Sequence, residues 1–109
     1  MNDHPLEKII RRAELAIRDH FSSASLGKFW VTHYGATDIN PKHLVIWLCV
    51  STDALKAHLL ASNEYRSVAR QSLLTAGYPA EVCGQIHVGV ESEETVNRES
   101  GGNWWHHWK

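Results

Sequence analysis

The sequence predicts a single α+β domain whose elements follow the order α-β-β-α-β. Three observations carry this prediction: an amphipathic segment near the N-terminus, an entirely apolar run near the middle, and an alternating run toward the C-terminus. A helix that connects two strands of one sheet makes a right-handed crossover and leaves these strands parallel. We therefore expect a mixed three-stranded sheet with its helices packed on one face. The opposite face stays open unless another segment covers it.

The length and composition agree with one domain over residues 1–109. A chain of 109 residues buries roughly two thirds of the surface that it exposes when unfolded, which suffices for one core. Apolar residues make up 43% and charged residues 21% of the chain, with a formal net charge of −1. Such values are typical of folded globular proteins. We divide the domain into a core over residues 5–90, an acidic segment over 91–103 and a tail over 104–109.

The first helix is expected over residues 5–21. Pro5 lies where the first turn of a helix tolerates proline, and apolar side chains follow at intervals typical of a helix. These are Leu6, Ile9, Ile10, Ala13, Ala16, Ile17 and Phe21. The helix also carries four basic residues among acidic ones: Lys8, Arg11, Arg12 and Arg18. They form either an ordinary solvated face or a basic face for phosphates or an acidic partner.

Two strands are expected next, over residues 28–34 and 44–50. The first is rich in aromatic and β-branched residues, and Gly35 follows it. The second is apolar throughout, which is typical of a strand buried in the middle of a sheet. A polar loop that contains Asn40 and Pro41 connects the two.

A second helical region and a third strand complete the core. The helical region begins after a cap at Ser51 or Thr52 and ends at Gly77. Polar residues 62–63 in its middle indicate a kink or the start of a second helix. The third strand has a period of two and one buried face, formed by Val82, Gly84, Ile86, Val88 and Val90.

Neither the cysteines nor the histidines have the spacing of a metal site. Cys49 and Cys83 each stand in an apolar run, as small buried side chains do. The eight histidines lack the spacing of a metal-binding motif. One alternative stays open, a site on the open sheet face that uses His33 and His87. We expect no resident metal and no cofactor.

The sequence also lacks the motifs of common enzyme classes. It contains no Gly-x-Ser-x-Gly turn and no glycine-rich phosphate loop before a helix. Adjacent glutamates such as Glu93 and Glu94 are typical of a solvated surface. We therefore expect a non-enzymatic protein without catalytic residues.

The C-terminal tail holds three tryptophans among its last six residues, a large apolar area that needs a surface to cover. One interpretation places Trp104 and Trp108 on the open sheet face, beside Trp30 or Trp47. The other places the tail against another protein, since tryptophan is enriched among the residues that dominate binding at interfaces. In that case a basic partner protein contacts the acidic and tryptophan side chains together: Glu91, Glu93, Glu94, Glu99, Trp104, Trp105 and Trp108.

The layout of helix, strand pair, interrupted helical region and last strand resembles that of KH-like domains, in particular the ribosome-binding factor A family. Residues 31–44 are similar to that family's strand-loop-strand, and Ala61-Ser62-Asn63 stands where the family has an Ala-x-Gly kink. The resemblance covers residues 5–90 and implies RNA or ribosome binding. This chain departs from the family in its near-neutral charge and its Trp-rich tail. It also lacks the Gly-x-x-Gly loop that RNA-binding KH domains use.

The size, the α/β architecture and the acidic rim are similar to those of small bacterial immunity proteins, which neutralise a toxin by covering its basic active site. This similarity implies binding to another protein, and a contiguous acidic patch over residues 91–99 would distinguish it from RNA binding. The longest apolar run, residues 44–50, is far shorter than the roughly 20 residues of a membrane span. No basic segment precedes an apolar stretch at the N-terminus. We therefore expect a cytoplasmic protein with no membrane partner.

Overall fold

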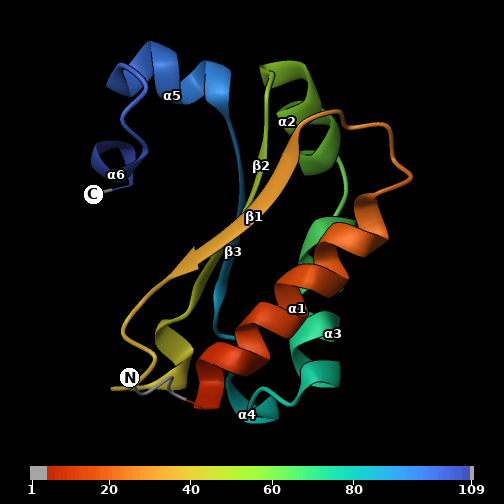
Figure 1. The fold of residues 1–109 in the computed structure, drawn as a ribbon, viewed down its shortest axis with the longest axis vertical. Coiled ribbons are helices and arrows are strands. Elements are labelled where there is room, and N and C mark those ends of the chain that lie inside the picture. The colour runs from red at the N-terminus through yellow and green to blue at the C-terminus, as the bar shows by residue number, and fades with distance from the viewer. Residues whose placement is uncertain (1–4, 109) are drawn as a thin grey trace.

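The computed structural model describes residues 5–108 and has the predicted α+β fold. Helices α1 and α3 lie on one side of a three-stranded sheet, and α5 and α6 lie on the other side (Figure 1). The elements are α1 (Pro5–Phe21), β1 (Phe29–Tyr34), η1 (Pro41–His43), β2 (Val45–Val50), α2 (Asp53–Leu60), α3 (Glu64–Ala76), α4 (Ala80–Cys83), β3 (His87–Ser92), α5 (Glu93–Ser100) and α6 (Trp104–His107).

Helix α1 has the predicted bounds because its apolar residues recur on one face. Ile10, Ala13, Ile17 and Phe21 are buried against the rest of the core, while the basic residues between them are exposed. The helix packs mainly on α3 and β1. It therefore forms, with α3, the layer that covers one sheet face.

The sheet is mixed, as predicted, with β2 in the middle. Strand β1 pairs with β2 in antiparallel register, and β3 pairs with β2 in parallel register. Side chains Ile46, Leu48 and Val50 of β2 are fully buried. This confirms that the apolar run is the central strand.

The second helical region consists of two helices separated at residues 61–63, so the predicted interruption is confirmed. Thr52 caps α2 by accepting a hydrogen bond from the backbone N–H of Leu55. Gly77 ends α3 with φ at 107°, in a left-handed conformation that glycine adopts without strain. The crossover from β2 to β3 thus runs through α2, α3 and the short α4.

The prediction of the third strand was wrong at its start and about its buried face. Val82 and Cys83 belong to α4, and β3 begins only at His87, where Val45 of β2 supplies the first pairing partner. Residues 88–92 of β3 are all buried. Both faces are covered because the C-terminal segment lies over the sheet face that would otherwise be open (Figure 1).

The boundary of the core also extends further than predicted. Ser92 ends β3 and caps α5 through its side chain, and Val96 of α5 is fully buried. Cys49 and Cys83 are buried free thiols, as predicted. Burial raises the pKa of the Cys49 thiol to about 12. Within residues 5–108, no helix combines the length and the apolar character needed to cross a membrane.

Candidate functional site

The candidate site is the sheet face opposite α1, together with α5 and α6. The alternation of side chains along paired strands assigns this face from the strand register. It carries Trp30, Thr32, Tyr34, Val45, Trp47, Cys49, His87, Gly89 and Glu91. Helices α5 and α6 cover part of it (Figure 1), and α6 with its C-cap carries Trp104, Trp105 and Trp108.

A cluster of aromatic rings fixes α6 to this face. Trp108 stacks on Trp47 with ring centroids 5.1 Å apart and an interplanar angle of 14°. Trp104 packs edge to face with Trp30 and with Trp108, with ring centroids 5.3 Å apart in each pair. Trp104 and Trp108 therefore cover the sheet, as one of the two interpretations of the sequence proposed.

Gly89 makes room for this cluster. A Cβ atom at Gly89 would lie 2.5 Å from the Trp47 ring, which is closer than atoms can approach. The absence of a side chain lets Trp47 lie over β3 and present its ring to Trp108. The indole N–H of Trp108 is buried and has no hydrogen-bond partner among residues 5–108, so ring packing must outweigh that loss.

A buried polar network holds the tail beside the aromatic cluster. Glu91 is only 6% exposed, and its carboxylate accepts hydrogen bonds from Lys56 Nζ at 2.7 Å and from His107 Nε2 at 2.8 Å. Ser100 Oγ lies 2.9 Å from His107 Nδ1. Burial disfavours the charged form of Glu91, but the bonds from Lys56, the Ser92 backbone and His107 outweigh it and lower its pKa. We call Lys56, Glu91, Ser100 and His107 the tail latch.

The tail latch contains a serine, a histidine and a glutamate in hydrogen-bonded order, the order found in serine nucleophile relays. A nucleophile of that kind also needs free backbone N–H groups for the oxyanion. The N–H groups of Gly101 and Gly102 both donate to the Val96 carbonyl instead. The arrangement is thus suited to fastening α5 and α6 to the sheet.

A second polar hub joins the start of α5 to the start of α2. The Asp53 carboxylate accepts hydrogen bonds from Ser92 Oγ at 2.6 Å, Thr95 Oγ1 at 2.6 Å and Arg98 at 2.8 Å. These bonds hold the pKa of Asp53 well below its usual range. In return, Glu94 accepts a bond from the Asp53 backbone N–H at 2.7 Å. Helix α5 is therefore held at its first turn as well as at its end.

Trp105 differs from its neighbours because 72% of it is exposed. A pocket of about 200 Å³ opens beside it, lined by Tyr34, Gly35, Trp105 and Trp108. The ring of Tyr34 lies 5.8 Å from that of Trp108, centroid to centroid. The docked tail thus presents one tryptophan to solvent at the edge of an aromatic pocket.

The structure separates the four acidic residues that the sequence grouped as a partner surface. The prediction that Glu91 belongs to a partner surface was wrong, because Glu91 lies in β3 and is buried in the tail latch. Glu93 accepts a hydrogen bond from Lys28 at 2.9 Å, and Glu94 caps α2. The Glu99 side chain is 57% exposed, and Arg98 lies 3.9 Å from it.

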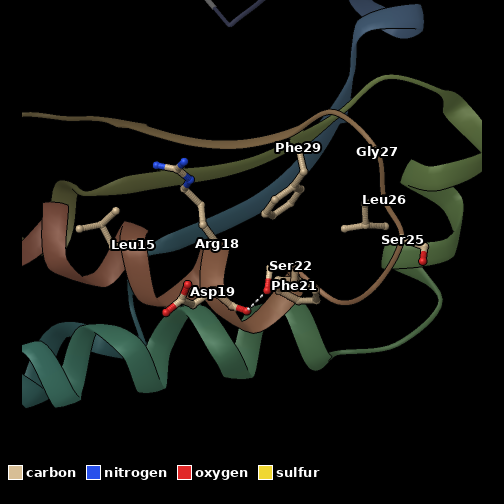
Figure 2. A pocket seen from close by; sticks show the side chains of 9 residues that line it. All are labelled: Leu15, Arg18, Asp19, Phe21, Ser22, Ser25, Leu26, Gly27 and Phe29. Atoms are coloured by element: carbon tan, nitrogen blue, oxygen red, sulfur yellow. Dashed lines mark hydrogen bonds between the residues drawn. The ribbon is translucent and has the colours of Figure 1, made fainter.

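The basic residues Lys8, Arg11, Arg12 and Arg18 are all exposed along α1. Arg18 borders a hollow of about 530 Å³ between the end of α1 and residues 22–28. Figure 2 shows its guanidinium extending from α1, while the Asp19 carboxylate points away from it. Phe21, Leu26 and Phe29 form the apolar wall of this hollow (Figure 2).

The histidines do not form the open-face site that the sequence left as an alternative. His33 faces α1, where it binds Glu14 at 2.8 Å and Glu7 at 3.2 Å. His87 lies on the opposite face, against Trp47. The hydrogen bond to Glu14 raises the pKa of His33 despite its partial burial. Among residues 5–108, no group of three or more candidate ligands is placed to hold a metal ion.

Sequence reasoning missed the tail latch and the Asp53 hub. One local signal was present: Ser92 and Thr95 bracket two glutamates, which is typical of a capped helix N-terminus, and Gly101 follows the helix end. The partners Lys56 and His107 gave no such signal, because they meet Glu91 only through the fold.

Comparisons with known proteins give no relative for this chain. No family model, no curated protein and no solved structure matches it.

Proposed function

We propose that this protein is a binding module that recognises a basic partner protein through α5 and α6. The observation that carries the proposal is the exposure of Trp105, at 72%, on a tail that is otherwise anchored. Exposure of a tryptophan ring to water is unfavourable, and tryptophan is among the residues that dominate the binding free energy of many interfaces. Because Trp104 and Trp108 are packed on the sheet, little conformational entropy remains to be lost when a partner binds.

The charge of the same surface supports a basic partner. Glu93, Glu94 and Glu99 lie on α5, which packs against α6. Exposed carboxylates steer a basic protein by long-range attraction and raise its association rate. Glu99 is suited to this role because its side chain is 57% exposed. Glu93 and Glu94 combine the charge with bonds that hold the fold.

More specifically, we propose that it is a cytoplasmic immunity protein that neutralises a toxin. The size, the architecture and a protruding tryptophan on a tail that packs against the helix of Glu93, Glu94 and Glu99 support it, since carboxylates and an exposed aromatic ring are suited to covering a basic active site. The occupant of the surface is then a nuclease or another enzyme that binds phosphates through basic residues.

A second candidate function is KH-like binding of RNA or the ribosome. Two features favour it: the interruption between α2 and α3 at residues 61–63, and the exposed basic residues of α1, namely Lys8, Arg11, Arg12 and Arg18. Acidic residues Glu7 and Glu14 share α1 and weaken its positive field, although both face His33. This candidate predicts binding that falls steeply with salt.

The test compares capture of cellular partners by four forms of the full chain. These are the wild type, Trp105→Ala, Glu99→Lys and the control Leu74→Ala, which truncates an exposed apolar residue on α3. We expect a basic protein that is captured by the wild type and the control but depleted about tenfold or more by Trp105→Ala. With the purified partner, Glu99→Lys should slow association and reduce its salt dependence.

Two results would decide against the proposal. The wild type and Trp105→Ala could capture every protein equally, which would show that Trp105 is not part of a binding interface. Alternatively, captured material could be sensitive to ribonuclease and lost when Lys8 and Arg12 are changed to glutamate. That outcome would establish the RNA-binding candidate instead.

A further inference from the structure

The pocket beside Trp105 has the features of a site for a cation. Three aromatic residues, Tyr34, Trp105 and Trp108, line it together with Gly35. The negatively polarised faces of such rings attract cations, and tryptophan does so most strongly. Its volume of about 200 Å³ is below the range of sites for drug-sized ligands, so the guest is a small group.

Hydrogen bonding narrows the chemistry of that guest. The Tyr34 hydroxyl already accepts a bond from Trp47 Nε1 at 3.2 Å, and the Gly35 carbonyl accepts one from Thr37 at 2.9 Å. A guest with several N–H donors would leave water for a mostly apolar lining whose two oxygens each already hold one hydrogen bond, so some of its N–H groups would stay unpaired, which costs free energy. A quaternary ammonium has no N–H donors and loses nothing in this respect.

We propose that the pocket formed by Tyr34, Trp105 and Trp108 binds a trimethylammonium group. Stacking on Trp47 holds the Trp108 ring in place before a ligand arrives, and the hydrogen bond from Trp47 and the contact with Trp108 hold Tyr34. This is the preorganisation that weak contacts require. This inference concerns the pocket itself and does not require a protein partner.

The probes are chosen so that charge, methylation and source can be told apart. Choline represents a free small molecule, and the amide of Nα-acetyl-trimethyllysine represents a modified side chain of a protein. 3,3-Dimethylbutan-1-ol has the shape of choline without its charge, and Nα-acetyl-lysine amide has the charge without the methyl groups. Each probe is titrated into the ¹⁵N-labelled full chain at pH 8, and the indole N–H signals of the five tryptophans are followed.

We expect choline and the trimethyllysine amide to shift the Trp105 and Trp108 signals with a Kd on the order of 1 mM. The neutral alcohol and the unmethylated lysine should bind about tenfold more weakly or not at all. If only the trimethyllysine amide saturates, the source is a modified protein. If choline binds equally, the group alone is recognised.

Variants distinguish binding in the pocket from nonspecific binding elsewhere on the protein. Trp105→Ala should weaken choline binding about tenfold, Trp105→Phe should weaken it less, and Leu74→Ala on α3 should leave it unchanged. Equal binding of choline and its neutral analogue would overturn the proposal, and so would a lack of any shift at Trp105 and Trp108. Neither result would bear on capture of a basic partner, because these titrations contain no protein partner.

Discussion

Truncation of Trp108 to alanine is expected to lower the free energy of unfolding by about 2 kcal/mol. Removal of a fully buried tryptophan costs about 3 to 5 kcal/mol, and each favourable aromatic pair adds about 0.5 to 1.5 kcal/mol. Trp108 stacks on Trp47 and contacts Trp104 and Tyr34, but its ring is partly exposed. Its buried indole N–H is also unsatisfied among the described residues, and truncation relieves that cost of about 1 to 3 kcal/mol.

The assay is urea unfolding of the full chain, supported by thermal melts. A loss of about 2 kcal/mol corresponds to a decrease in melting temperature of about 8 to 16 °C for a domain of this size. Trp108→Phe keeps a packed ring and removes the unsatisfied N–H, so it should cost less than about 1 kcal/mol.

Trp105→Ala is the matched comparison, since the side chain has the same chemistry and is three positions away. Because Trp105 is 72% exposed, its truncation should change stability by no more than about 0.5 kcal/mol. Equal losses for Trp105→Ala and Trp108→Ala would refute the reasoning. Such a result would mean that the different burial of Trp105 and Trp108 does not determine their contributions to stability.

Three further predictions concern the core and the sheet. Ile46→Ala removes a fully buried side chain of the central strand and should cost about 2 to 5 kcal/mol in urea melts; a loss below about 0.5 kcal/mol would place it at a surface. Gly89→Ala should cost about 1 to 3 kcal/mol by the same assay, because the new Cβ collides with Trp47; unchanged stability would contradict the close packing. The pKa of His33 is raised in the fold, chiefly by its bond to Glu14. The stability that His33 contributes is therefore fully present below its unfolded pKa of 6.5 and is lost as the pH rises through its pKa in the folded state. Melts from pH 5.5 to 8.5 should show this loss in the wild type and a smaller one in Glu14→Gln, and parallel curves would refute the pairing.

Local sequence signals were sufficient for much of the fold. The helical spacing of apolar residues set α1 at its observed bounds, and the uninterrupted apolar run identified β2 as the central strand. Gly77 and Thr52 marked helix ends because their conformations and side-chain bonds are local. These features depend on neighbours in the sequence, which is why periodicity and capping rules could find them.

The start of β3 could not be found in this way. Val82 and Ile86 continue the alternation of the strand in the sequence, but β2 offers no partner before Val45, which pairs with His87. Residues 80–83 form a helical turn instead and bury Cys83. Pairing between distant segments therefore overrode a local pattern.

The candidate site was predicted in part. The tryptophans of the tail and the acidic segment beside them were singled out from composition alone, but the helix α5 within that segment was not predicted. The burial of Glu91 was not, because it depends on Lys56 and His107, which are 35 and 16 positions away. A buried carboxylate and a surface carboxylate look alike in a sequence until their partners are known.

The most direct test of the proposed binding surface is ¹⁹F NMR of the full chain labelled with 5-fluorotryptophan, titrated with the captured partner. The five tryptophans give separate signals, each assigned by substitution with phenylalanine. We predict that the Trp105 signal shifts or broadens at stoichiometric partner, while those of Trp30 and Trp47 beneath the tail stay unchanged. If the partner binds and the Trp105 signal does not change, the surface of α5 and α6 is not the interface.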